Sequence, residues 1–126
     1  MTDNAPLVLI VDDEPDMCWV LKTLLAERGF DFRIAQTGEA ALRLVGSTKF
    51  RIALLDAKLT DMDGLELARR IQSMDPEIYI IMISGYYYTD DVDIQEAVEE
   101  GIVSGFIAKP FLHEDVIRIL LAVDSS

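Results

Sequence analysis

Short apolar runs alternate with amphipathic stretches along the chain. The runs have the length of strands buried in a sheet, and they occupy residues 7–11, 30–35, 52–55, 78–83 and 105–108. Apolar residues at helical spacing fill the stretches between them, at residues 16–28, from 38 onward, 63–74, 90–101 and 113–123. Gly29 follows the first helical stretch at the usual position of a left-handed cap, and Thr37 precedes the second as a candidate N-cap. The pattern predicts five strands that alternate with five helices.

Regular alternation with short connections is typical of a parallel sheet covered by helices on both faces. Because crossovers between parallel strands are right-handed, the remaining candidates are doubly wound sheets. Five strands favour the flavodoxin-like order 2-1-3-4-5, and the weak alternation of residues 30–35 suits an edge strand. We therefore expect one α/β domain over residues 1–126, with no output domain.

Composition narrows the class of protein. The chain is 51% hydrophobic and 27% charged, which is typical of a globular protein. No apolar stretch reaches the roughly 20 residues of a membrane helix. The one cysteine, Cys18, permits no internal disulfide, which favours a reducing compartment and a cytoplasmic protein; we interpret Cys18 and Trp19 as core or helix-face packing. The formal net charge of -12 argues against direct binding of nucleic acid, because it repels phosphate backbones.

Polar residues follow the predicted strands. Ligands of open α/β sheets bind beyond the carboxyl ends of the strands, at the switch point between the first and third strands. Asp12 and Asp13 follow the first strand, and Asp56 follows the third. The fourth strand ends in Ser84, and Lys109 follows the fifth. We expect these side chains to meet at one rim of the sheet.

Three carboxylates at one rim repel one another. Two unit charges about 4 Å apart cost roughly 4 kcal/mol at an effective dielectric near 20, so such a cluster takes up a proton or binds a cation. A ligand set made of oxygens alone favours Mg²⁺ or Mn²⁺ over zinc. Lys109 offers a positive charge, and Ser84 a hydroxyl, to an anion that the metal also holds. This combination indicates a phosphoryl site in which a carboxylate can be the nucleophile.

Each residue also has a structural interpretation when it is taken alone. Asp12 and Asp13 suit the cap and first turn of a helix. Asp56 suits a solvated loop, Lys109 an exposed position before a proline, and Ser84 a turn ahead of a glycine. Their coincidence at matched strand ends favours a common site.

Four stretches together resemble the receiver domain of response regulators in bacterial two-component signalling: LIVDDEP at 9–15, LLDAKLTDMDG at 54–64, IMISG at 81–85 and FIAKPF at 106–111. They span nearly the whole chain at the spacing of that family. The resemblance implies that Asp56 accepts a phosphoryl group from a histidine kinase or a phosphotransfer protein. The protein would then be a signalling switch that is catalytic only on itself, through self-phosphorylation from phosphodonors and slow autodephosphorylation.

The resemblance also implies the ligands of a metal ion. Asp13 and Asp56 would hold Mg²⁺, or Mn²⁺, together with the backbone carbonyl of Lys58. Asp12 would contact the ion through water, and Lys109 would pair with the phosphoryl oxygens.

Further residues would carry the signal outward. Ser84 would move toward the phosphoryl group, and Phe106 would follow it inward from an aromatic switch position. The peptide bond before the proline that corresponds to Pro110 is commonly cis in the family. Family members signal through the face built by the fourth helix, the fifth strand and the fifth helix. This implies an output partner or domain that the sequence does not identify, and a phosphorylation-dependent homodimer.

Some positions depart from the family pattern. Thr60 stands where a proline is common, which predicts a less rigid loop after Asp56, and Gly85 stands where alanine is common. Lys58 and Tyr86 occupy the two positions that tune dephosphorylation.

Three consecutive tyrosines, Tyr86, Tyr87 and Tyr88, precede the fourth helix. The bland interpretation is that one or two rings pack inward and one is exposed. The functional interpretation is an interaction patch that changes with phosphorylation.

Three other classes compete with this interpretation. A haloacid-dehalogenase-type hydrolase would need an acid two residues after the nucleophile, where Lys58 stands. A dinucleotide-binding domain would need G-x-G-x-x-G after the first strand, where DDEPD stands. A receiver-like interaction module that phosphorylation does not control would normally have lost part of the acidic cluster or the lysine.

Overall fold

The structure, a computed structural model, describes residues 7–85 and 92–124 of the chain. Its elements follow one another as β1 (Leu7–Val11), α1 (Pro15–Glu27), β2 (Asp31–Ala35), α2 (Gly38–Ser47), β3 (Ile52–Asp56), α3 (Gly64–Met74), β4 (Tyr79–Ser84), α4 (Val92–Glu99), β5 (Gly105–Ala108) and α5 (His113–Asp124). This is the predicted alternation of five strands and five helices.

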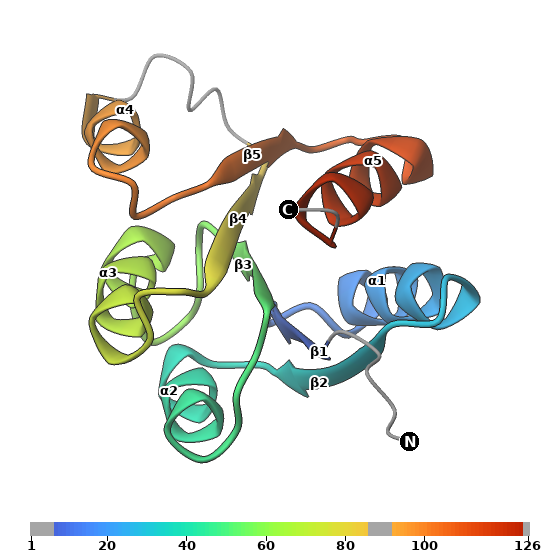
Figure 1. Cartoon of the computed structure of the whole chain (residues 1–126), viewed down its shortest axis with the longest axis horizontal. Helices are drawn as coiled ribbons and strands as arrows, with labels where there is room; N and C mark the ends of the chain where they lie inside the picture. Colours follow the sequence, from blue (N-terminus) through green and yellow to red (C-terminus); the bar gives the residue numbers. More distant parts are fainter. Residues whose placement is uncertain (1–6, 86–91, 125–126) are drawn as a thin grey trace.

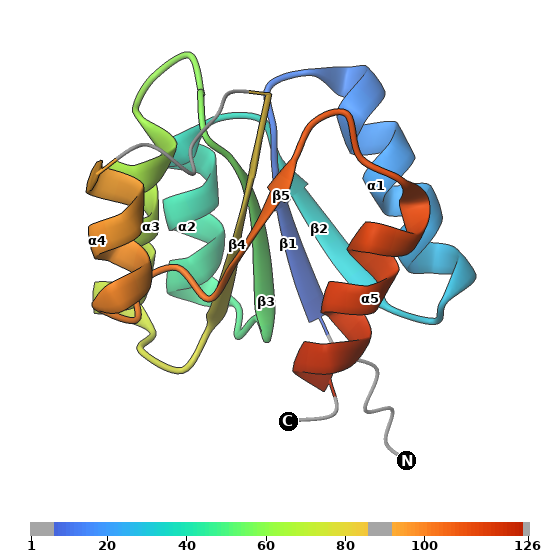
Figure 2. The ribbon, with the colours of Figure 1, turned by 90° about the horizontal axis from the view of Figure 1, so that it is seen from above.

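All neighbouring strands pair in parallel, and the order in the sheet is β2-β1-β3-β4-β5. This confirms the predicted flavodoxin-like topology, with β2 at an edge. Helices α2, α3 and α4 cover one face of the sheet, and α1 and α5 cover the other (Figure 1). In Figure 2 the carboxyl ends of the strands lie along the upper rim of the sheet.

The strands are continuous apolar runs because the sheet has a hydrophobic core on each of its two faces. Successive residues of a strand point to opposite faces. In β1, Leu9 and Val11 pack in the core that faces α2, α3 and α4, whereas Val8 and Ile10 pack in the core that faces α1 and α5. Because both faces are covered by helices, every position of β3 is buried, including Asp56 at its end.

The local signals in the sequence also hold, with one exception. Thr37 is the N-cap of α2, where its hydroxyl accepts a hydrogen bond from the amide of Ala40, and Gly29 has a positive φ of 79° after α1. Cys18 is buried as expected. Trp19 is 61% exposed, so the core interpretation of this residue is wrong. A residue next to Cys18 points about 100° away around the helix, out of the stripe that faces the sheet.

Candidate functional site

The strand ends bring the predicted site residues to one rim of the sheet. Asp12 directly follows β1, Asp56 is the last residue of β3, and Ser84 is the last residue of β4. Lys109 directly follows β5. Parallel strands all end at the same edge, so residues that lie tens of positions apart in the chain become neighbours there.

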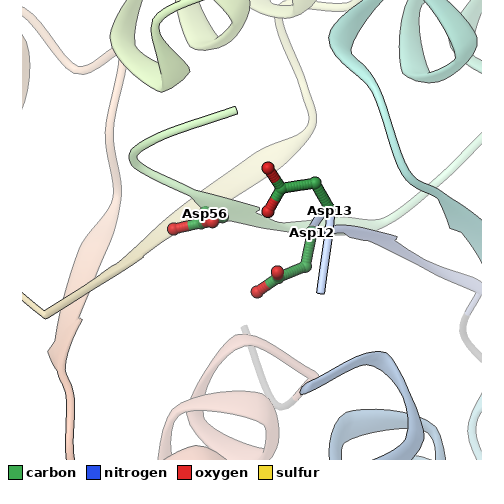
Figure 3. Close-up of side chains that lie close together, drawn as sticks. All are labelled: Asp12, Asp13 and Asp56. Carbon is green, nitrogen blue, oxygen red and sulfur yellow. The ribbon is translucent and has the colours of Figure 1, made fainter. Parts of the chain in front are cut away.

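Three carboxylates form the centre of the site (Figure 3). One oxygen from each of Asp12, Asp13 and Asp56 can be chosen so that all three lie within 4.8 Å of one another. Asp12 is 2% exposed and Asp56 is 8% exposed, whereas Asp13 is half-buried. A cluster of hard oxygen donors of this kind suits a divalent cation such as Mg²⁺.

The ammonium group of Lys109 faces this cluster. Its Nζ lies 3.6 Å from Oδ2 of Asp12, 3.7 Å from Oδ1 of Asp56 and 3.9 Å from Oε1 of Glu14. Glu14 was not among the predicted site residues, because its place before Pro15 is typical of a helix start. Its position directly after Asp12 and Asp13 is the signal that could have indicated a fourth carboxylate at the rim.

Burial dominates the electrostatics of the two least exposed carboxylates. Desolvation raises the pKa of Asp12 to about 6; the backbone amide of Glu14, which donates to Asp12 Oδ1 at 2.9 Å, offsets part of this effect, and the charge of Asp56 adds to it. Desolvation also raises the pKa of Asp56, although Lys109 and the amide of Lys58 act in the opposite direction. Keeping these two buried carboxylates charged therefore costs free energy, and a bound proton or metal cation would relieve that cost.

We expect Asp12→Asn to stabilise the metal-free protein at pH 8. The folded-state pKa of Asp12 lies above its unfolded value, so the folded state binds more protons between about pH 4 and 6, and the charged form costs stability above that window. The free energy of unfolding should rise by on the order of 1 kcal/mol at pH 8. The difference from wild type should shrink as the pH falls to 4. Urea unfolding followed by circular dichroism at both pH values, with EDTA present, measures this. An equal difference at both pH values would contradict it.

A pocket of about 260 Å³ opens beside the cluster. It is lined by Asp13, Glu14, Asp56, Lys58, Ser84, Gly85 and Lys109. The side chain of Lys58 is exposed, and its amide nitrogen lies 3.4 Å from Oδ1 of Asp56. The pocket thus combines carboxylates with a cation and a hydroxyl, so the residues present fit a divalent cation together with a small anion.

The remaining predicted residues divide between the rim and the core. Ser84 is 1% exposed, and its carbonyl oxygen accepts a hydrogen bond from the amide of Lys109 at 2.6 Å. Phe106 is half-buried against the core that faces α2, α3 and α4. The Lys109–Pro110 peptide bond is cis, as the resemblance implies. The three tyrosines at 86–88 lie outside the described residues.

Gly64 allows the loop after Asp56 to close tightly. A Cβ atom at Gly64 would collide with the carbonyl oxygen of Asp56 and would lie 2.7 Å from Cα of Ala57. The amide of Gly64 donates to the carbonyl oxygen of Ala57 at 2.9 Å, which fastens the base of the loop.

We expect Gly64→Ala to destabilise the protein, because backbone atoms that cannot rotate away occupy the space of the new methyl group. The free energy of unfolding should fall by about 1–3 kcal/mol, measured by urea unfolding. Gly46→Ala is the matched control, since the nearest atom to its new Cβ is a methionine methyl at 3.6 Å. Within helix α2 that change should be neutral or stabilising by about 1 kcal/mol. Equal losses in both variants would contradict the steric argument.

A doubly wound parallel sheet with three carboxylates and a lysine at its switch point defines a receiver-like domain. The family model of the response regulator receiver domain matches residues 8–121. The chain therefore belongs to the response regulator receiver domain family, and it is a receiver domain of two-component signalling.

Individual relatives agree with this assignment. The chain is 35% identical over 104 residues to sporulation initiation phosphotransferase F of Bacillus subtilis, covering 82% of each chain. It is 28% identical over 110 residues, 87% of its length, to the transcriptional regulatory protein ZraR of Escherichia coli, but it spans only 24% of that regulator. The crystal structure of response regulator TrrA from Thermotoga maritima in complex with Mg(2+)-BeF superposes with a TM-score of 0.82 at 26% identity, covering 94% of this chain and 98% of the other.

The described part of the chain contains no helix that could span a membrane. Across residues 7–85 and 92–124, every helix is too short or too polar to cross a bilayer.

Proposed function

We propose that the chain is a phosphorylation-dependent signalling switch in which Asp56 accepts a phosphoryl group from a histidine kinase or a phosphotransfer protein. The observation that carries this proposal is the position of Asp56. It lies at the end of β3, within 4.8 Å of two other carboxylates and 3.7 Å from the ammonium group of Lys109. A structural carboxylate would need one cation as a partner; a second and third carboxylate at the same place add repulsion without a structural benefit.

The proposed metal ligands are Asp13, Asp56 and the backbone carbonyl of Lys58, with Asp12 in contact through water. Mg²⁺ bound there would offset negative charge on the transferring phosphoryl group. The relative TrrA has been crystallised in complex with Mg(2+)-BeF, which supports Mg²⁺ as the ion for this chain as well. Mn²⁺ has similar ligand preferences and would substitute for it.

Transfer from phosphohistidine is a displacement at phosphorus. A carboxylate oxygen of Asp56 attacks the phosphorus atom and forms the new O–P bond, while the N–P bond breaks and its electron pair stays on the imidazole nitrogen. The ammonium group of Lys109 would pair with the phosphoryl oxygens, since it already lies beside Asp56. Water attack on phosphorus later breaks the O–P bond, releases inorganic phosphate and restores Asp56.

Ser84 and Phe106 would change position in response to the added phosphoryl group. Ser84 ends β4 beside the pocket, and Phe106 lies on the neighbouring strand β5, paired with Met82. Movement of Ser84 toward the phosphoryl group would let the ring of Phe106 move inward. A full reversal from 1:99 to 99:1 requires about 5.5 kcal/mol of differential stabilisation between the two conformations.

The proposed output surface is the face of α4, β5 and α5. Val92 and Val98 on α4 and Leu121 on α5 are exposed apolar side chains, which supports contact with a partner or with a second copy after phosphorylation. Tyr86, Tyr87 and Tyr88, which precede α4 in the sequence, are proposed to take part in the same interaction. The oligomeric state measured with and without beryllofluoride tests this part, and an unchanged state together with unchanged partner binding would contradict it.

Labelling with acetyl phosphate tests the proposal as a whole. The protein is incubated with the phosphodonor in Mg²⁺ or in EDTA, and intact mass reports the acyl phosphate. We expect one phosphoryl group in Mg²⁺ and none in EDTA, with peptide mapping placing it on Asp56. A folded protein that stays unlabelled with every phosphodonor tried, including a phosphohistidine protein, would favour an interaction module without phosphorylation.

A further inference from the structure

The loop that follows Asp56, residues 57–63, is anchored on the start of helix α2. Asp61 accepts two backbone hydrogen bonds there: its Oδ1 from the amide of Gly38 at 2.9 Å, and its Oδ2 from the amide of Glu39 at 3.0 Å. In Figure 2 this loop arches over the upper rim next to the start of α2. The two ends of this contact are more than 20 residues apart in the chain.

Helix α2 needs these two acceptors. The first amides of a helix have no partner inside the helix. Thr37 serves two amides, because its hydroxyl accepts from Ala40 at 3.1 Å and its carbonyl oxygen accepts from Ala41 at 3.1 Å. The amides of Gly38 and Glu39 remain, and the carboxylate of Asp61 takes both. These two hydrogen bonds also lower the pKa of Asp61, so the carboxylate stays ionised toward the positive end of the helix dipole.

An apolar contact reinforces the anchor. A Cβ atom at Gly38 would lie 2.5–2.8 Å from three atoms of the Met62 side chain, so Met62 lies directly over this glycine. The absence of a side chain at Gly38 therefore lets the tip of the loop approach the backbone of α2. The tip is held by Asp61 through polar bonds and by Met62 through packing.

Backbone contacts close the base of this loop. The amide of Gly64 donates to the carbonyl of Ala57, and a backbone bridge joins Lys58 to Asp63. Lys58 therefore lies at the base of a loop that two backbone contacts close. Thr60, near the tip, stands where the family commonly has a proline, and it lacks the ring that restricts the φ angle of a proline. Contacts with α2 are the restraint that the structure offers in its place.

We propose that Asp61 is a positioning residue for the metal site: by binding the start of α2, it holds the loop that presents the backbone carbonyl of Lys58. This inference rests on the proposed function, because Lys58 is a metal ligand only under that proposal. Coupling between two sites is reciprocal, so Mg²⁺ binding should in turn protect the amides of Gly38 and Glu39 from exchange.

The test measures Mg²⁺ affinity by calorimetry and amide exchange by NMR on the same variants. Asp61→Ala should raise the Kd for Mg²⁺ by about 10-fold, the lower end of the effect of outer-shell residues on metal affinity. It should speed exchange of the Gly38 and Glu39 amides about 5-fold, the factor that corresponds to loss of a capping bond. Asp63→Ala is the matched control. It removes the same charge from the same loop, and the exposed Asp63 makes no side-chain cap to α3. Its Mg²⁺ Kd should stay within about 2-fold of wild type.

A second variant tests the same contact without changing charge. Gly38→Ala should displace the side chain of Met62, which removes the apolar part of the anchor, and should raise the Mg²⁺ Kd in the same direction. Should Asp61→Ala unfold, this variant carries the comparison. Equal Mg²⁺ affinity in Asp61→Ala, Gly38→Ala and Asp63→Ala would overturn the positioning role. Absence of Mg²⁺ binding by wild type would instead overturn the proposed metal site. In that case the exchange rates would still report whether Asp61 caps α2.

Discussion

Replacing Asp56 with asparagine is expected to abolish Mg²⁺-dependent labelling by acetyl phosphate, with a loss of about 100-fold or more in rate. The amide that replaces the carboxylate is a poor nucleophile, and it removes one of the proposed metal ligands. The variant should nevertheless fold, and without metal it should be at least as stable as wild type. Burial already raises the pKa of Asp56, so the ionised form costs free energy in the folded state. Intact mass after incubation with the phosphodonor measures labelling, and urea unfolding measures stability.

The matched control for this variant is Asp63→Asn. Asp63 lies in the same loop but is exposed, and it should be labelled at the wild-type rate. Labelling of Asp56→Asn at that same rate would show that another residue accepts the phosphoryl group. Loss of labelling in both variants would show that the charge of the loop, rather than Asp56 as nucleophile, governs the reaction.

Replacing Lys109 with methionine is expected to have opposite effects on stability and on metal binding. Lys109 lies within 4 Å of Asp12, Asp56 and Glu14, so its loss leaves these carboxylates facing one another without this cation. The free energy of unfolding at pH 8 in EDTA should fall by about 2 kcal/mol. Mg²⁺ should then bind about 10-fold more tightly, because the ion no longer competes with an ammonium group for the same oxygens. Urea unfolding and calorimetry measure the two quantities.

Lys49→Met is the control for loss of a positive charge. Lys49 also pairs with two carboxylates, Asp75 at 3.3 Å and Glu77 at 3.4 Å, but it precedes β3 and lies at the opposite end of the sheet from the rim. Its side chain is largely exposed, so the change in stability should stay within about 1 kcal/mol, and the Mg²⁺ Kd should not change. Weaker Mg²⁺ binding in Lys109→Met than in Lys49→Met would contradict the proposed competition.

The fold could be predicted from the sequence because both faces of the sheet are covered. Continuous apolar runs such as residues 52–55 mark buried parallel strands, and the polar residues that stop them mark the rim. The structure confirms the strand order and brings Asp12, Asp13 and Asp56 together. The polar residues expected at two strand ends, Asp56 and Ser84, are the last residues of β3 and β4. The apolar runs stop one residue earlier, but pairing along the sheet continues through both residues.

Contacts between segments far apart in the chain could not be predicted from the sequence. Gly38 begins α2 and Asp61 caps it, but nothing in the spacing of these two residues indicates this contact. The contact depends on how α2 and α3 pack. The contact of Glu14 with Lys109 could not be predicted for a related reason. A glutamate before Pro15 suits a helix start whether or not its side chain also reaches Lys109. Trp19 shows the limit of size and hydrophobicity as a guide to burial. Its position around α1, rather than its chemistry, leaves it exposed.

The most direct measurement is a crystal structure of the protein with Mg²⁺ and beryllofluoride, a mimic of the phosphoryl group. We expect beryllium bonded to a carboxylate oxygen of Asp56, Mg²⁺ contacted by Asp13 and by the carbonyl of Lys58, and Nζ of Lys109 turned toward the fluorides. Beryllofluoride bound away from Asp56, with the rim carboxylates contacting no ion, would contradict a phosphoryl-accepting site at the ends of these strands.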